Sequence, residues 1–258
     1  MPKDRPPAFS QSVTSTNQVS GFTYDVAGNL AGIPGGGSYT YDAENHLTSA
    51  AGVAYTYDGD GERVEKSNGE IYWYTSGGEV LDETDLSGNL TSEYIFFGGA
   101  RIARRDGSGN VFYYLTDHLG SSREIVEAGQ TTACYDADFY PFGGERAYTN
   151  TCQQNYKFTG KERDPESGLD DFEARYYGSS IARFTSPDDP FVGWQLNDPQ
   201  SLNLYAYVQD NPINDVDPTG HCLIVNGGSV MQCGFSELEA AMNTMTIEGW
   251  NYTGIGVP

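Results

Sequence analysis

The sequence predicts an all-β fold built from antiparallel hairpins that repeat along most of the chain. The 258 residues include 32 glycines, and glycine so far above its ~7% average disfavours a helical bundle. Aromatic residues make up 13% of the chain, spread too evenly for a disordered acidic polymer. Short aromatic and β-branched segments alternate with Gly, Asn and Asp turns, as a β-rich fold requires.

The strands belong to units that begin at tyrosines spaced 16 to 21 residues apart. These tyrosines are Tyr24, Tyr41, Tyr57, Tyr74, Tyr94, Tyr114 and Tyr135. In each unit an alternating strand such as residues 53–57 turns one aromatic face inward, and a second strand such as residues 70–74 runs back. Because one hairpin cannot bury its aromatic face alone, we expect neighbouring units to pair into one continuous curved or spiral sheet.

The turns between these strands share one chemical pattern. Three of them read YDVAGNL, YDAENHL and YDGDGER. The aspartate supplies side-chain-to-backbone hydrogen bonds, and the Gly or Asn tolerates a positive φ, so each turn favours a tight hairpin. Residues 58–62 superficially resemble a calcium loop, but Arg63 stands where that loop needs glycine, so we expect another hairpin turn.

The charge of the chain excludes two classes of function. Fourteen Lys and Arg against 36 Asp and Glu give a net charge of −22, which would repel a nucleic-acid backbone. No run approaches the ~20 apolar residues of a membrane span. We expect most of the acidic residues to form a solvated rim of hairpin turns. The first 18 residues lack the apolar stretch of a signal peptide.

The four cysteines leave two readings open. Cys134 with Cys152, and Cys222 with Cys233, could each close a disulfide in an exported protein, while four buried thiols fit equally well. They show no CxxC spacing and no histidine in ligand register. We therefore expect no metal and no organic cofactor.

Downstream of the repeats, several longer motifs follow one another in order. They read YYLTDHLGSSREI (113–125), YDADFYPFGG (135–144), KFTGKERDPESGLDDFEARYYGSSIARFTSPDDP (157–190) and NDPQSLNLYAYVQDNPINDVDPTG (197–220). Together with Y-D-x-x-G-N-L at ~20-residue spacing, they resemble the RHS or YD-repeat family and its RHS repeat-associated core domain. The resemblance covers roughly residues 20 to 221.

The resemblance and the composition divide the chain into four expected parts. These are a disordered tail (1–20), the YD repeats (21–144), the loop-rich RHS-associated core (145–221) and a variable C-terminal tip (222–258). A capping box predicts one short helix in the tip, at about 236–246. The handful of repeats also suggests a fragment of a longer gene product or a short orphan unit.

The resemblance also implies an activity. In bacterial polymorphic toxins and in the C-subunits of insecticidal Tc toxins, the core domain is an aspartyl protease that cuts its own chain just beyond a D-P-x-G motif. It thereby releases a variable C-terminal segment inside a β-sheet shell. By motif, the arginine of A-R-Y-Y falls on Arg175, the aspartate of S-x-D on Asp188 and the aspartate of D-P-x-G on Asp217. Pro218 and Gly220 complete the last motif.

Two features of the chain depart from the family pattern. The interval of 29 residues between Asp188 and Asp217 is long, so we expect residues 191–198 to loop out. The resemblance places the cut between His221 and Cys222, where the family usually has leucine in an apolar pocket. An imidazole would be held less well there, unless the pocket opens to water.

The chemistry explains why such a set of residues is needed. Two carboxylates held close together cannot both ionise, so one keeps its proton while the other acts as base on a water. A guanidinium can hold one carboxylate ionised through a two-pronged contact. No metal takes part in this reaction.

Other interpretations stay open at the level of sequence. Asp-Pro is a common turn opener, and Asp164, Asp189 and Asp198 also precede prolines, so Asp217 could be structural and Asp189 could replace Asp188. The chain could instead be a non-enzymatic surface scaffold that binds carbohydrate through exposed Tyr and Trp, or a truncated remnant.

If the leading interpretation holds, the partners are the chain's own C-terminal segment and other RHS or toxin-complex subunits. The protein then reaches the bacterial surface or exterior without an N-terminal signal peptide; otherwise it is cytoplasmic.

Overall fold

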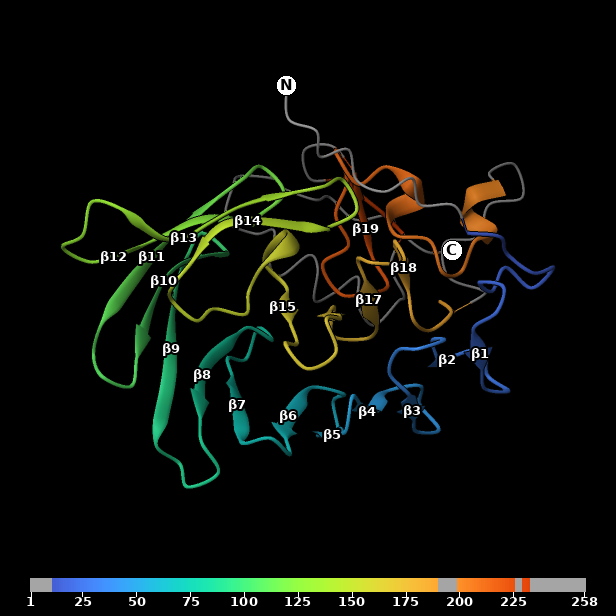
Figure 1. Cartoon of the computed structure of the whole chain (residues 1–258), viewed down its shortest axis with the longest axis horizontal. Coiled ribbons are helices and arrows are strands. Elements are labelled where there is room, and N and C mark those ends of the chain that lie inside the picture. Colours follow the sequence, from blue (N-terminus) through green and yellow to red (C-terminus); the bar gives the residue numbers. More distant parts are fainter. Residues whose placement is uncertain (1–10, 190–198, 226–228, 233–258) are drawn as a thin grey trace, which may run out of the picture.

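A computed structural model describes residues 11–189, 199–225 and 229–232. Its main element is a twelve-stranded antiparallel sheet in which each strand pairs with the next along the chain. Figure 1 shows this sheet as a long arc that curves around the strands of the segment after it, residues 151–221, which we call the core segment. The predicted continuous, curved antiparallel sheet is therefore confirmed.

The twelve strands follow the chain without a crossover. They are β3 (Tyr39–Tyr41), β4 (Leu47–Ala50), β5 (Val53–Tyr57), β6 (Arg63–Lys66), β7 (Glu70–Tyr74), β8 (Val80–Thr84), β9 (Leu90–Phe97), β10 (Ala100–Asp106), β11 (Val111–Thr116), β12 (Ser122–Glu127), β13 (Ala133–Phe139) and β14 (Glu145–Asn150).

Smaller elements flank and fill the arc. The core segment forms a four-stranded sheet of β15 (Glu162–Arg163), β16 (Asp170–Asp171), β17 (Tyr176–Gly178) and β18 (Arg183–Phe184). Two hairpins are β1 (Thr23–Tyr24) with β2 (Leu30–Gly32), and β19 (Leu223–Val225) with β20 (Ser229–Gln232). Three 3₁₀ turns are η1 (Phe158–Gly160), η2 (Pro199–Leu202) and η3 (Val208–Asp210). Within the described residues, no helix has the length and apolarity to cross a bilayer.

The aspartate turns have the geometry that the sequence predicts. Asp85 Oδ1 accepts the backbone N–H of Ser87 at 2.8 Å and of Asn89 at 2.9 Å. Gly88 between them has a φ of +81°. The same pair of acceptor contacts recurs at Asp25, Asp42, Asp58, Asp106 and Asp117. The segment that resembled a calcium loop is thus a hairpin turn.

The tyrosines alternate as expected, with one face of the sheet turned toward the core segment. Tyr55 and Tyr72 are 5% and 3% exposed, whereas Trp73 on the opposite face is 53% exposed. The Tyr55 ring stacks on Tyr176 of β17 with a centroid distance of 5.9 Å. The inner face of the arc therefore packs on the core segment at this point.

A buried ionic network ties the arc to the core segment. Arg63 of β6 contacts Asp164 at 2.7 Å and Glu162 at 2.9 Å, and Lys66 contacts Asp164 at 3.1 Å. Arg63 is 3% exposed, and Lys66 and Asp164 are fully buried. Glu162 and Asp164 are exceptions to the expected solvated rim of acidic residues, because they are core groups neutralised by two cations.

Residues 11–20 differ from the disordered tail that the sequence predicts. Val13 and Val19 form a β-bridge, and Val19 is only 3% exposed. Arg183 Nη2 donates to the backbone oxygen of Asn17 at 2.9 Å. The bridge within the stretch and the contact to Arg183, which is distant in sequence, order these polar residues despite their composition.

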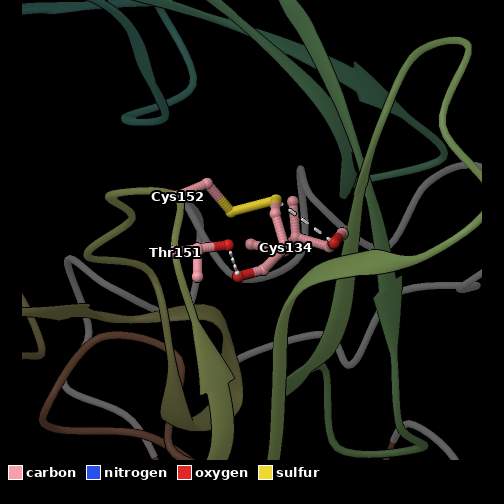
Figure 2. Close-up of a disulfide and its surroundings, with 4 residues drawn as sticks. Cys134, Thr151 and Cys152 are labelled. Atoms are coloured by element: carbon pink, nitrogen blue, oxygen red, sulfur yellow. Dashed lines mark hydrogen bonds between the residues drawn. A yellow bond between two sulfur atoms is a disulfide. The ribbon is translucent and has the colours of Figure 1, made fainter.

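A disulfide joins Cys134 on β13 to Cys152 after β14, with the two Cα atoms 5.3 Å apart. Figure 2 shows it beside Thr151, whose backbone N–H and hydroxyl both donate to the Cys134 carbonyl oxygen, at 2.7 and 3.1 Å. None of the described cysteines is free. The second expected pair includes Cys233, which lies outside the described residues, as does the predicted helix at 236–246.

Candidate functional site

Three segments of the core bring the predicted site residues together. Arg175 directly precedes β17, and Asp188 follows β18 after a short turn. Tyr177 of β17 pairs with Phe184 of β18 in antiparallel register, so Arg175 and Asp188 leave the same end of this hairpin. The segment carrying Asp217 reaches that end just before β19 begins.

Arg175 links the other site residues through its whole guanidinium group. Its Nη2 lies 2.9 Å from Asp188 Oδ2 and 3.6 Å from Asp217 Oδ2. Its Nε donates to the carbonyl oxygen of Gly220, and its Nη1 donates to that of Leu204 at 3.0 Å. One cation thus holds both carboxylates and two backbone oxygens, a task that suits the rigid fork of arginine.

The guanidinium is fixed from the apolar side as well. Arg175 is 4% exposed, and its Cζ atom lies 3.8 Å from the centroid of the Phe184 ring. Phe184 belongs to a buried cluster of aromatic side chains with Phe158, Phe172, Tyr177 and Tyr207. A cation over an aromatic face in a dry site gains electrostatic stabilisation, so the aromatic core supports the charge.

The D-P-x-G motif forms a closed loop around the Asp217 carboxylate. Val216 and Ile224 bridge at the base of the loop through two backbone hydrogen bonds of 3.2 and 2.9 Å. Inside it, Asp217 Oδ1 accepts backbone N–H groups from residues 219, 220 and 222, at 3.2, 2.8 and 2.9 Å. The last donor is the amide nitrogen of Cys222, which belongs to the peptide bond expected to be cut.

Gly220 has a steric reason to be glycine. Its φ is +83°, and a Cβ atom there would lie 2.8 Å from the carbonyl oxygen of Phe172 and 2.9 Å from the nitrogen of Arg175. Any side chain would therefore push the loop away from the arginine segment.

The two carboxylates sit in different environments. Asp217 is 5% exposed, and burial raises the pKa of its carboxyl from 3.8 to about 6, although Arg175 and the Cys222 N–H partly oppose the rise. The Asp188 side chain is 26% exposed and lines a small pocket of about 50 Å³ together with Asp217 and His221. One carboxyl is thus buried and readily protonated, and the other is open to solvent beside a cation.

The His221 side chain turns into this pocket. Its Nδ1 lies 2.7 Å from Asp188 Oδ1, and polar residues 200, 201 and 203 line the pocket nearby. The resemblance suggested an apolar pocket at this position. In this chain a carboxylate meets the imidazole instead.

The structure accordingly brings together Arg175, Asp188, Asp217 and the His221–Cys222 bond, with Pro218 and Gly220 inside the same loop. The neighbouring Asp189 contributes its backbone N–H to Asp188 Oδ1 at 2.9 Å. The segment expected to loop out, residues 191–198, lies outside the described residues. Within the described part of the chain, no group of His, Cys, Asp and Glu is arranged to hold a metal ion.

Sequence reasoning missed two features of the site. The contact between His221 and Asp188 joins residues 33 positions apart, and no local pattern marks it. The same is true of the Leu204 carbonyl, which accepts from Arg175 across 29 positions.

Known proteins resemble this chain both in sequence and in fold. No family model matches the sequence. It is 31% identical over 240 residues to the tRNA nuclease WapA of Bacillus subtilis, covering 86% of this chain and 10% of that protein. It is 26% identical over 196 residues to toxin subunit YenC2 of Yersinia entomophaga, covering 65% of this chain and 19% of that protein. The chain therefore spans about a tenth of the WapA relative it matches.

Solved structures agree on the fold. The crystal structure of TcdB2-TccC3-TEV matches with a TM-score of 0.59 and 21% identity over 76% of this chain and 11% of that chain. The crystal structure of TcdB2-TccC3 without its hypervariable C-terminal region matches with a TM-score of 0.58 and 20% identity, again over 76% of this chain and 11% of that chain. Together with the YD turns and the ordered core motifs, these relatives show that the chain belongs to the RHS/YD-repeat family.

Proposed function

We propose that this chain is the self-cleaving part of an RHS-repeat toxin, and that it cuts its own backbone between His221 and Cys222. One observation carries the proposal: the N–H of Cys222 donates to Asp217 Oδ1 at 2.9 Å. The nitrogen that would leave is therefore already in contact with the carboxyl that would protonate it. Asp188, held by the same arginine, faces the pocket from which water would come.

The two carboxyls divide the reaction between them. A pKa of about 6 keeps a useful fraction of Asp217 protonated near neutral pH, which suits a general acid. Asp188, ionised beside Arg175, takes a proton from water, and the water oxygen attacks the carbonyl carbon of His221. Asp217 gives its proton to the Cys222 nitrogen as the C–N bond breaks, leaving an amine on Cys222 and a carboxylic acid on His221, which then ionises to solvent.

The pocket and the loop favour this chemistry. About 50 Å³ is enough space for a few water molecules beside polar groups. Since the carboxyls and the bond lie in one chain, the reaction is intramolecular, and positioning can supply up to ~7–11 kcal/mol of the barrier. The reaction uses no metal and no organic cofactor.

The biological setting follows from the relatives. We infer that the twelve-stranded arc is part of a β-sheet shell, and that the cut releases residues 222–258 and whatever follows them as the toxin segment. Toxin-complex subunits are the expected partners, since similar folds occur in the TcdB2-TccC3 structures. The Cys134–Cys152 disulfide fits an exported protein, because such bonds persist in oxidising compartments.

Intact mass spectrometry of the purified protein tests the proposal. Wild type should yield two fragments, whereas Asp217→Asn and Asp188→Asn should each stay as one 28.1 kDa chain. Asp189→Asn is the matched control, because it removes an adjacent carboxylate that also lines the pocket, and it should still be cut. A wild-type protein that stays whole once folded would refute the proposal.

A further inference from the structure

The position after D-P-x-G carries a titratable side chain that contacts the reacting groups. His221 Nδ1 lies 2.7 Å from Asp188 Oδ1, and both side chains are 26% exposed. The cleaved bond is the peptide bond of this same histidine. A leucine, which the family resemblance leads one to expect here, could make no such contact.

The contact fills the second acceptor position on Oδ1 of the proposed base and leaves one position on Oδ2 for water. Asp188 Oδ2 is held by Arg175 at 2.9 Å, and Oδ1 already accepts the N–H of Asp189 at 2.9 Å. An ionised carboxylate can only accept hydrogen bonds. The imidazole nitrogen that faces Oδ1 must therefore carry a proton, and the imidazole is a donor to Asp188 in both of its charge states.

We propose that His221 is a positioning residue that controls self-cleavage through Asp188, orienting the base when the imidazole is neutral and blocking it when the imidazole is protonated. This inference rests on the proposed function and deepens it. An imidazolium forms a charge-assisted hydrogen bond, which is roughly twice as strong as a neutral one. Together with Arg175 it would neutralise Asp188 from both sides, so the carboxylate could no longer take a proton from water.

The charges around the imidazole are compatible with both of its states. Asp188 and Asp189 face it from the segment after β18, Asp217 from its own loop, and Arg175 from the start of β17. The lining residues from η2 and the turn after it, Gln200, Ser201 and Asn203, carry no charge. No cationic side chain from η2 therefore lines the pocket and opposes protonation of the imidazole.

Cleavage requires a protonated Asp217 and a neutral His221, and these two requirements together confine it to a narrow range of pH. Asp217 is protonated below about pH 6, which favours the acid step as pH falls. The imidazole takes up one proton as pH falls, so the fraction of protein in which Asp188 is unblocked falls by up to about tenfold for each pH unit. Wild type should therefore lose its rate more steeply on acidification than a variant without the imidazole.

The test follows the cleavage rate against pH in the full chain. Protein denatured in guanidinium is diluted into buffers from pH 4.5 to 8, and the cut fraction is measured by mass spectrometry over time. The variants are His221→Leu, which removes the contact, and His221→Asn, which keeps a neutral donor. Uncut Asp217→Asn, refolded in parallel and followed by circular dichroism, separates slow folding from slow cleavage at each pH.

The possible results separate the inference about His221 from the proposed self-cleavage. Normalised to their own rates at pH 7, both His221 variants should be at least about tenfold faster than wild type at pH 5. If wild type and both variants share one pH profile, with cleavage still abolished by Asp217→Asn, this inference fails and the proposed function survives. If no version is cut at any pH, the proposed function fails and this inference fails with it.

Discussion

Asp217 should destabilise the folded protein at neutral pH, and this cost can be measured without any cleavage. Burial raises the pKa of its carboxyl from 3.8 to about 6. A group whose pKa is raised on folding contributes stability below the unfolded value and loses it as pH rises through the folded value. A shift of this size corresponds to about 3 kcal/mol of unfolding free energy in all, of which about 2.4 kcal/mol is lost between pH 4 and pH 7.

Two variants isolate this effect, because both are expected to stay whole. Asp188→Asn keeps the titrating Asp217, whereas Asp217→Asn removes it and leaves an oxygen able to accept the same backbone N–H groups. From pH 4 to pH 7, the unfolding free energy of Asp217→Asn should rise by about 2 to 3 kcal/mol relative to that of Asp188→Asn. The gain falls below the full value because Asp188 itself contributes to the raised pKa.

Urea unfolding at half-unit pH steps, followed by tryptophan fluorescence, provides the assay. Every titrating group other than Asp188 and Asp217 is common to the two variants, so its effect cancels in the difference. A variant that carries both Asp→Asn changes, measured against Asp188→Asn, removes the contribution of Asp188 itself. Parallel stability curves across this range would show that Asp217 is not a buried, raised-pKa acid, and would remove the physical basis for its role as proton donor.

Three further predictions concern the scaffold of the site. Gly220→Ala should cost about 1–3 kcal/mol of unfolding free energy and abolish cleavage, because the added methyl meets the carbonyl oxygen of Phe172; thermal denaturation and intact mass check this, and a fully cut, equally stable variant would contradict it. Arg63→Met should destabilise by about 3–5 kcal/mol, because it leaves the buried Glu162 and Asp164 with Lys66 as their one remaining cation among the described contacts; urea unfolding measures this, and a loss below 1 kcal/mol would contradict it. Replacing both Cys134 and Cys152 with serine opens a cross-link with a separation of 18 residues and should cost about 2–4 kcal/mol; urea unfolding against oxidised wild type measures this, and equal stability would contradict it.

The repeats could be predicted because their determinants are local. The aspartate turn is complete within five residues, as at Asp85 to Asn89, where the acceptor, the donors and the positive-φ glycine are all present. The alternation of Tyr72 with Trp73 likewise follows from the two-residue period of a strand. Such features need no tertiary information.

The charged core could not be predicted for the opposite reason. Arg63 and Lys66 lie on a strand whose neighbours suggest a solvated face, yet their partner Asp164 lies about 100 residues further along the chain. Contacts between residues far apart in sequence also limited the prediction of the candidate site. Motif order identified Arg175, Asp188 and Asp217, but the contact of His221 with Asp188 emerges only when the hairpin of β17 and β18 meets the D-P-x-G loop.

The position of the cut tests the central claim most directly. Edman sequencing and mass measurement of the smaller fragment from freshly folded wild type, kept at neutral pH, should both give a chain that begins at Cys222. Acid lysis at Asp-Pro bonds would instead give fragments that begin at Pro218 or another proline. A fragment beginning anywhere other than Cys222, or a chain that remains whole, would contradict the account.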